Sequence, residues 1–369
     1  MNKEERSAAR KAKIAAFKDS AAAQKDSQIF GLPFSVKESE VVLIPVPWEV
    51  TVSFRAGTAN GPEAIREASC QIDLYDPICQ DAWKYGFVME EVNEIQRKQG
   101  RCLRDVAVEC IHYQASGGSL EDAAFKVLQN HVNQGSQLLN NWLKEKALSY
   151  LRQDKLVGVV GGDHSVPLGL MQALAEHHGT YGILHIDAHY DHRDAFEGFE
   201  FSHASIMRNA SHIKEVEKIV HVGIRDYCKE EHDFVVQSGR RFETFTDWHM
   251  ACDEFYGRNT WNDQCEKIIA NLPQRVYISF DIDGLDSSLN RNTGTRVPGG
   301  LSFREACFLL WRVMQSHRKI IGFDLCEVAP ESPLELRDDW AGDFDANVGA
   351  RILYRLCSFA ANSTLGVSD

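Results

Sequence analysis

The sequence predicts an α/β protein, a three-layer α/β/α sandwich in which helices cover both faces of a mostly parallel sheet. Apolar, β-branched runs recur from residue 40 onward, helix-type segments separate them, and neither a linker nor an internal repeat interrupts residues 40–360. Strands buried on both faces read as continuous apolar runs, because neither face presents side chains to water. We therefore expect a single domain over residues 40–369, preceded by an N-terminal extension over residues 1–39.

The expected strands and helices alternate along the chain, as they do in a parallel sheet with crossover helices. The strands are VVLIPVP (41–47), LVGVV (156–160), YGILHI (181–186), KIVHVGI (218–224), RVYISFDI (275–282) and KIIGFDL (319–325). The helices are expected at 61–69, 121–151, 165–178 and 302–317. Pro62 stands near the start of the first helix, where its missing N–H would have no partner in any case.

The composition argues against several classes of function. The 369 residues are 44% apolar and 25% charged, as in ordinary globular proteins, and the formal net charge of −13 is opposite to the basic surface that nucleic acid requires. No apolar run approaches the roughly 18 residues that span a membrane. Ten cysteines without a C-x-x-C pair are typical of reduced thiols. We therefore expect a cytoplasmic protein without a thiolate zinc site.

The N-terminal extension begins with a polar stretch, residues 1–28, that is rich in Ala, Lys and Glu. This composition predicts a helix or partial disorder, and it lacks the apolar region of a secretory signal. Two interpretations stay open, a solvated tail or an arm that packs on a neighbouring subunit, because composition does not distinguish them.

Titratable side chains collect just after the expected strands. In parallel α/β sheets, ligands bind outside the carboxyl ends of the strands. In an extended chain, alternate side chains share a face, so a D-x-H-x-D or D-x-D pattern places its members on one side. Buried carboxylates are costly unless a cation or partner neutralises them. The candidate residues are His164, Asp187, His189, Asp191, Asp281 and Asp283, with Glu327 nearby.

Two His and four Asp exceed the needs of one ion and suit two divalent ions bridged by carboxylates. The carboxylate-rich set favours Mn²⁺, with Fe²⁺, Co²⁺ or Ni²⁺ as further candidates and Zn²⁺ less favoured. Two such ions can share a water, convert it to hydroxide near neutral pH and polarise an electrophile. The alternative for any single Asp is a helix cap or a buried hydrogen bond. The blocks DAHYD and DIDGLD together on one scaffold favour the metal site.

The blocks GGDHS, DAHYD, SFDIDGLD, TGT and PGGL, in this order, resemble the signature blocks of the ureohydrolase family, which includes arginase, agmatinase and guanidine hydrolase. The resemblance covers about residues 40–360. It implies an α/β/α sandwich with a mostly parallel eight-stranded sheet and a homo-oligomer, either a hexamer or a trimer. It also implies one ion on His164, Asp187, Asp191 and Asp281, and a second ion on Asp187, His189, Asp281 and Asp283.

The resemblance further implies three catalytic roles. Asp191 would orient a hydroxide shared by the ions, which attacks the guanidinium carbon, and His203 in EFSHAS would shuttle protons. Glu327 would hold the guanidinium, whose planar fork of donors a carboxylate accepts bidentately. The leaving nitrogen must be protonated, and His203 suits that transfer because the ordinary pKa of histidine lies near working pH.

The loop HRDAFEGFEFSHAS bears on the substrate. The family resemblance implies that an arginase reads the amino-acid end of arginine with Asn and Ser in this loop. Here the loop contains no Asn, and Ser202 is its only Ser before His203, which argues against the recognition of arginine. Its acids could receive the distal ammonium of agmatine, whereas its aromatic rings could close on a small cation. The residues concerned are Arg193, Asp194, Phe196, Glu197, Phe199, Glu200 and Phe201.

A second segment, PWEVTVSFRAGTANGP (47–62), follows the first strand. Trp48, Thr51 and Ser53 could line a small pocket there, with core packing as the alternative for Trp48. With its N-terminal extension, PWEVTVS and EGFEFSHAS, the chain most resembles the guanidine hydrolase subgroup. That resemblance implies cleavage of free guanidine to urea and ammonia, with Ni²⁺ as the first candidate and Mn²⁺ as the alternative. Agmatinase, which converts agmatine to putrescine and urea, is the alternative function.

Two competing classes have a different fit. A zinc deacetylase of the same fold needs one ion, which leaves several of the six candidate ligands without a role. A metal-bearing pseudoenzyme would be favoured if a ligand were missing, but all six positions are filled. Next to the ligands, we expect His185 to hydrogen-bond one of them and His192 to be exposed. Arg225 and Asp226 are expected to pair near the rim of the site.

Overall fold

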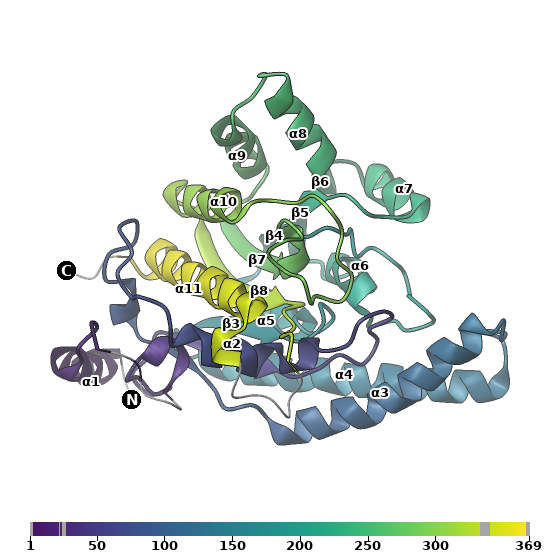
Figure 1. The fold of residues 1–369 in the computed structure, drawn as a ribbon, viewed down its shortest axis with the longest axis horizontal. Helices are drawn as coiled ribbons and strands as arrows, with labels where there is room; N and C mark the ends of the chain where they lie inside the picture. Colours follow the sequence, from purple (N-terminus) through teal and green to yellow (C-terminus); the bar gives the residue numbers. More distant parts are fainter. Residues whose placement is uncertain (1–2, 22, 24–26, 333–339, 367–369) are drawn as a thin grey trace.

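The computed structural model describes residues 3–21, 23, 27–332 and 340–366, so residues 1–2, 22 and 24–26 of the N-terminal stretch lie outside the description. Eight parallel strands form one sheet in the order β2-β1-β3-β8-β7-β4-β5-β6 (Figure 1). The expected parallel eight-stranded sheet is therefore confirmed. The strands are β1 (Val41–Val46), β2 (Phe87–Met89), β3 (Leu156–Gly161), β4 (Tyr181–Ile186), β5 (Val216–Ile224), β6 (Phe242–Thr246), β7 (Arg275–Asp281) and β8 (Lys319–Cys326).

Helices cover both faces of the sheet and bury a separate apolar cluster on each. One cluster includes residues of α2, α9, α10 and α11, and the other includes residues of α3, α4, α5 and α6 (Figure 1). Within the described part of the chain, no helix combines the length and apolar content needed to cross a membrane. The helices are α1 (Lys3–Ala16), α2 (Gly61–Ser69), α3 (Glu94–Ala115), α4 (Ala123–Leu151), α5 (Leu168–His178), α6 (Ile206–Ser211), α7 (Lys229–Gln237), α8 (Asp247–Phe255), α9 (Trp261–Ala270), α10 (Phe303–Gln315) and α11 (Phe344–Leu365).

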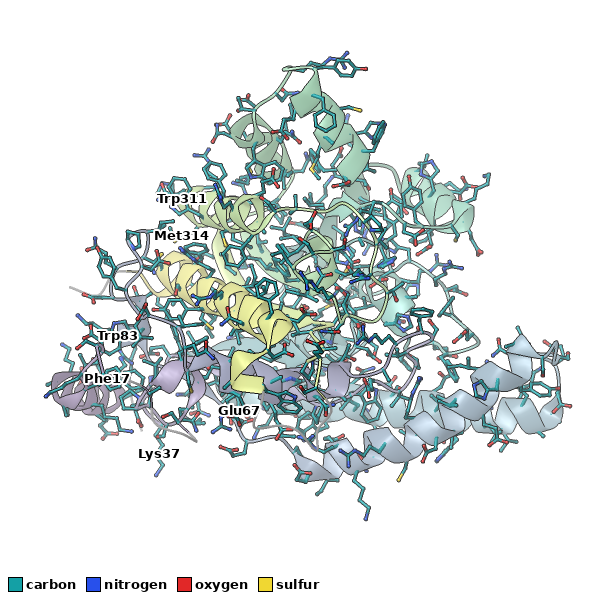
Figure 2. The ribbon with its side chains drawn as sticks, viewed as in Figure 1. Phe17, Lys37, Glu67, Trp83, Trp311 and Met314 are labelled. Carbon is teal, nitrogen blue, oxygen red and sulfur yellow. The ribbon has the colours of Figure 1, made fainter. Side chains whose placement is uncertain are left out.

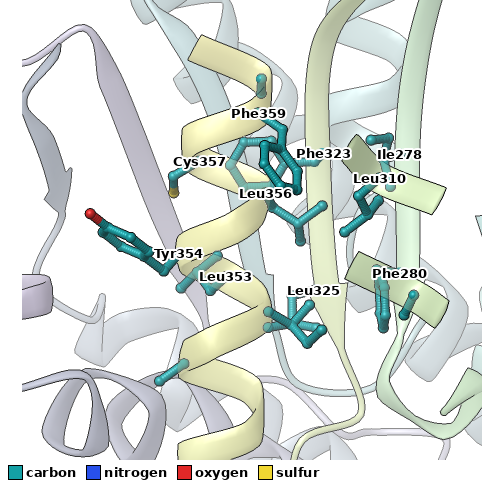
Figure 3. Close-up of a cluster of buried hydrophobic side chains, with 14 of the residues drawn as sticks. Ile278, Phe280, Leu310, Phe323, Leu325, Leu353, Tyr354, Leu356, Cys357 and Phe359 are labelled. Carbon is teal, nitrogen blue, oxygen red and sulfur yellow. The ribbon is translucent and has the colours of Figure 1, made fainter. Parts of the chain in front are cut away.

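Helix α11 supports the strands that carry the site. Its side chains Leu353 and Phe359 lie beside Phe323 and Leu325 of β8, and all four are buried (Figure 3). Burying a side chain of this size contributes roughly 1.5–3 kcal/mol. The helix begins at the cap residue Asp343, whose side chain accepts a hydrogen bond from the main chain of the first turn. This packing fixes the direction in which β8 delivers its carboxyl end.

Helix α1 packs against its own chain rather than extending into solvent. Arg6 is 3% exposed and lies 2.9 Å from Glu40, the residue before β1, and Arg10 also pairs with Glu40. After the helix, the ring of Phe17 stacks at a tilt on Trp83, with 5.4 Å between the ring centroids (Figure 2). Ion pairs and an aromatic contact therefore hold the extension against the start of the first strand.

Candidate metal centre and active site

Four adjacent central strands, β3, β8, β7 and β4, deliver the candidate residues to one edge of the sheet. His164 follows β3, Glu327 follows β8, Asp281 ends β7, and Asp187 follows β4. The carboxyl ends of neighbouring parallel strands meet at the same edge. The fold therefore brings together residues that are far apart in the sequence.

The first group surrounds one ring nitrogen of His164. Its Nδ1 lies 3.0 Å from Oδ2 of Asp187, 3.2 Å from Oδ2 of Asp191 and 3.3 Å from Oδ2 of Asp281. All four side chains are buried. These are the four residues that the family resemblance assigns to one ion.

The second group lies around His189. Its Nδ1 is 3.1 Å from Oδ2 of Asp283 and 3.4 Å from Oδ1 of Asp187. Asp187 thus directs one oxygen to each group, which is the arrangement a bridging ligand needs. Asp281 accepts a 2.7 Å hydrogen bond from the main chain of Asp283, which ties the two acids together.

The chemistry of this donor set fits divalent cations. Burial and the neighbouring charges of Asp283 and Asp187 raise the pKa of Asp281 well above its ordinary value. Burial and Asp187 raise the pKa of Asp191 to about 6. Several carboxylates crowded in a dry site repel one another, and bound cations remove that repulsion. Carboxylate oxygens and imidazole nitrogens at this density suit two ions better than one.

Turns, and not the alternation of side chains along a strand, bring the acids together. The expectation that the D-x-H-x-D and D-x-D patterns lie in extended chain is therefore wrong. Strand β4 ends at Ile186, before the DAHYD block, and Asp191 has a left-handed backbone with φ of 54°. The main-chain amides of Met207 and Arg208 each donate a 3.0 Å hydrogen bond to the carbonyl of Asp191 and so fix this turn. Asp283 likewise lies in a short 3₁₀ turn after β7.

Glu327 is held in a constrained position beside the first group. It is 6% exposed, and its backbone is left-handed with φ of 64°, a conformation that L side chains rarely adopt. Its Oε1 accepts a 2.9 Å hydrogen bond from the amide of His164, and its own amide donates to Gly162. A Cβ at Gly294 would lie 3.2 Å from Oε2 of Glu327, so this glycine leaves room for the carboxylate.

The candidate proton shuttle His203 also faces this site, but its protonation differs from the sequence expectation. Burial, together with the positive charges of His189 and His164, lowers its pKa to about 3. The ring is therefore neutral at working pH. The ring of Phe196 stands edge-on to His203, with 5.8 Å between the centroids.

A cavity of about 260 Å³ opens onto these residues. Of the three residues expected to line a pocket after β1, Ser53 lies on its wall. Trp48 is 1% exposed within the apolar cluster on the α3–α6 face, so core packing describes it. Thr51 is equally buried and lies away from the wall. The remaining lining includes His164, His189, Asp191, Arg193, Phe196, His203, Asp226, Tyr227, Glu231, Asp281, Asp283, Thr295 and Glu327.

A family model described as the arginase family matches residues 39–357 of the chain. The chain belongs to the arginase family. This confirms the resemblance to ureohydrolases.

Individual relatives have related descriptions. The N(1)-aminopropylagmatine ureohydrolase of Thermus thermophilus is 31% identical over 294 residues, which covers 80% of this chain and 84% of the relative. An agmatinase of Proteus mirabilis is 32% identical over 300 residues and covers 81% and 82% of the two chains. The structure of proclavaminate amidino hydrolase from Streptomyces clavuligerus superposes with a TM-score of 0.67 at 24% identity, over 93% of this chain and all of that one. This last likeness shows the fold alone.

A supporting layer beneath the site of this arginase-family chain was missed by sequence reasoning. Nε2 of His164 lies 2.9 Å from Oγ of Ser279 and 3.6 Å from Oδ1 of Asp324. Tyr277 donates a 2.6 Å hydrogen bond to the other oxygen of Asp324. An Asp in the middle of the apolar run KIIGFDL was the signal that could have identified this layer.

The residues that flank the ligands show one agreement and two differences. His185 contacts Asp187 as expected, with 2.9 Å between Nε2 and Oδ2. His192 is only 2% exposed, so the expected exposure is wrong; its ring packs beside Phe242. Arg225 donates its hydrogen bonds to main-chain carbonyls, including that of Asp283, and not to the neighbouring Asp.

Proposed function

We propose that this arginase-family protein is a hydrolase with two divalent metal ions that cleaves free guanidine to urea and ammonia. Ni²⁺ is the first candidate ion and Mn²⁺ the alternative. The observation that supports the choice of substrate is the wall of the cavity, which includes the cation Arg193 and the aromatic ring of Phe196. The carboxylates Asp226 and Glu231 lie on the same wall. A second positive charge on the substrate would lie near Arg193, whose own charge is paired with that of Glu231.

The reaction follows from the positions of the side chains. Two divalent ions held by His164, Asp187, His189, Asp191, Asp281 and Asp283 would supply an activated water and polarise the substrate. Glu327 accepts N–H groups of the guanidinium and fixes its plane beside the first group of ligands. Asp191 accepts a hydrogen bond from the attacking water and so orients it. His203, neutral at rest, takes a proton from that water and gives it to the leaving nitrogen, which departs as ammonia.

Two long helices hold the loop that carries Phe196 over the cavity. Gln114 of α3 donates a 2.6 Å hydrogen bond to the carbonyl of Glu197, and Gln129 of α4 donates a 2.5 Å hydrogen bond to that of Gly198. Arg193 lies over the ring of Phe196, 5.2 Å from its centroid, and pairs with Glu231 at 3.3 Å. A loop fixed in this way holds the ring of Phe196 beside His203 on the cavity wall. This position supports a short substrate, because the ring occupies space that a longer one would need.

The acids of the same loop support this choice. Asp194 pairs with Arg208 at 3.1 Å, and its side chain is 73% exposed. Among the described residues of the loop before Ser202, the cavity wall includes Arg193 and Phe196 but neither Glu197 nor Glu200. The carboxylates expected to receive the ammonium of agmatine therefore lie away from the wall.

Agmatine is the second candidate substrate. Asp226 lies on the cavity wall, 4.0 Å from Nε2 of His189, with its side chain 64% exposed. An exposed carboxylate at the mouth could receive a distal ammonium. The relatives described as agmatinases and as aminopropylagmatine ureohydrolases favour the same class.

Urea release from guanidine, agmatine, arginine, 4-guanidinobutyrate and guanidinopropionate, measured after loading with Ni²⁺ or Mn²⁺, tests the proposal. We expect the highest kcat/KM with guanidine. In Phe196→Ala, the ratio of the agmatine rate to the guanidine rate should rise, whereas Phe255→Ala, at a ring that is 78% exposed on α8, should leave it unchanged. Release from agmatine but not from guanidine in the unaltered protein would overturn the choice of substrate.

We also propose a homo-oligomer in the cytoplasm. The exposed apolar side chains Ile95 of α3 and Leu138 of α4, which are 67% and 65% exposed, support self-association because they line a common groove. The ten free cysteines support a reducing compartment. Mass photometry of the purified protein measures the number of subunits.

A further inference from the structure

Three buried histidines form a continuous chain that leads away from Asp187. Nε2 of His185 lies 2.9 Å from Oδ2 of Asp187, and Nδ1 of His185 lies 2.9 Å from Nδ1 of His221. Nε2 of His221 in turn lies 3.2 Å from Nε2 of His192. The exposed fractions of the three rings are 0%, 0% and 2%. We call His185, His221 and His192 the histidine chain.

The register of the sheet creates the first contact. His185 of β4 and His221 of β5 are partners in the parallel pairing of these strands, so their side chains leave the sheet on the same face. His192 reaches the chain from the loop after the DAHYD block, and its ring packs beside Phe234 and Phe242. Strand pairing and aromatic packing therefore fix the three rings.

The contacts allow one arrangement of protons if the rings are neutral. An ionised carboxylate only accepts, so Nε2 of His185 must carry the proton that faces Asp187. Nδ1 of His185 is then an acceptor, and Nδ1 of His221 must donate to it. Nε2 of His221 is consequently an acceptor, and Nε2 of His192 must donate. Each ring fixes the tautomer of the next.

The surroundings keep the middle ring of the chain, His221, neutral. Burial, together with His192 and His185, lowers the pKa of His221 well below its ordinary value. Nδ1 of His192, at the end of the chain, has no hydrogen-bond partner within the described residues, so no contact favours a proton on this nitrogen over Nε2, which faces His221.

We propose that His221 is a positioning residue for the metal centre: it fixes the tautomer and orientation of His185, which in turn holds the carboxylate of Asp187. This inference rests on the proposed metal site but not on the identity of the substrate. Asp187 is the acid whose two oxygens face the two ligand groups. A rotation of this carboxylate would therefore disturb both groups at once. A hydrocarbon side chain at position 221 could fill the same space but could not donate to His185.

The first test compares two variants for metal binding rather than for activity. His221→Leu removes the donor, whereas the amide of His221→Asn can still donate toward His185. Competition with a chelator for Ni²⁺ measures affinity. We expect the affinity for Ni²⁺ to be about 10- to 100-fold weaker in His221→Leu. In His221→Asn, where the hydrogen bond can be kept, we expect an affinity within about threefold of the original. The matched control His212→Asn, at an exposed histidine after α6, should leave affinity unchanged.

The outcomes of this test separate the two proposals. Equal affinity in His221→Leu and the unaltered protein, or an equally weak affinity in both variants, would overturn the role of His221. Failure of the unaltered protein to bind any divalent ion would instead overturn the proposed function.

The second test uses the unaltered, metal-free protein, so it still decides if a variant fails to fold. Long-range ¹⁵N–¹H correlation spectra of protein labelled with ¹⁵N-histidine report which ring nitrogen carries the proton, and proton–proton contacts of the His221 ring with its neighbours Tyr190 and Phe242 assign its signals. We expect the proton of His221 on Nδ1 and those of His185 and His192 on Nε2. A proton on Nε2 of His221 would contradict the proposal.

Discussion

The main-chain amide of His164 donates a 2.9 Å hydrogen bond to Oε1 of Glu327, although the two residues are 163 positions apart in the sequence. The contact joins the turn after β3 to the turn after β8, and these strands are neighbours in the sheet. A hydrogen bond from the main chain of a candidate metal ligand thus holds the carboxylate of the candidate guanidinium acceptor. This bond restricts the freedom of the Glu327 side chain relative to His164.

Glu327→Gln should weaken catalysis without unfolding the protein. The glutamine oxygen can still accept from the amide of His164, but the negative charge that faces the guanidinium is lost. We expect kcat/KM to fall by about 30- to 1,000-fold, which corresponds to about 2–4 kcal/mol, while two ions remain bound. Glu217→Gln, at an exposed position of β5, is the control. Activity within threefold of the original would contradict the assigned role.

Gly294→Ala should displace the carboxylate of Glu327 by steric contact, without changing its charge. The added methyl group would lie 3.2 Å from Oε2 of Glu327, closer than ordinary contacts allow, so the carboxylate must shift. We expect a rise in KM of about tenfold, equivalent to about 1.4 kcal/mol, with little change in the melting temperature. Gly342→Ala, where nothing lies within 4 Å, should behave like the original protein. Identical kinetics in both variants would argue against a fixed Glu327.

Removal of the charges on α1 should destabilise the domain. The double variant Arg6→Ala/Arg10→Ala leaves Glu40, which is 5% exposed, without these two partners. Breaking a buried ion pair from one side costs about 3–5 kcal/mol. We expect a loss of about this size, because Arg6 is itself only 3% exposed. Urea denaturation measures the free energy of unfolding. Lys11→Ala, at an exposed position of the same helix, should have no effect, and equal midpoints for both would show that the helix contributes little.

His178, the last residue of α5, should make the protein sensitive to acid. Burial, with smaller effects of His177 and Arg275, lowers its pKa from 6.5 to about 4. Between these two pH values the unfolded chain binds a proton that the folded protein does not, so the free energy of unfolding decreases as pH falls through this window. The ring is half-buried, so solvent limits the effect to about 1 kcal/mol. In His178→Gln, denaturation at pH 7.5 and pH 4.5 should show a correspondingly smaller loss; an unchanged loss would contradict the assignment.

The sequence predicted the central part of the sheet well and its edges poorly. β3, β4, β7 and β8 are mainly apolar runs because both their faces are covered. The edge strand β2 has three residues, and the other edge strand, β6, is the mixed run FETFT, so neither has that signature. Edge strands are paired on one side and are shaped mainly by tertiary contacts.

The site was predictable as a set of residues but not as a geometry. Motif spacing identified the residues that meet around His164. It did not predict the left-handed turn at Asp191, because an Asp at this position is equally compatible with the end of a strand. The low pKa of His203 and the burial of His192 depend on residues from other parts of the chain. Local sequence could not reveal either property, because both arise from packing.

Anomalous diffraction from crystals of the protein loaded with Ni²⁺ tests the metal centre most directly. We predict two peaks per chain, one beside Nδ1 of His164 and the other beside Nδ1 of His189, with the carboxylate of Asp187 between them. A single peak, or no peak, among these side chains in fully loaded crystals would contradict a site for two ions.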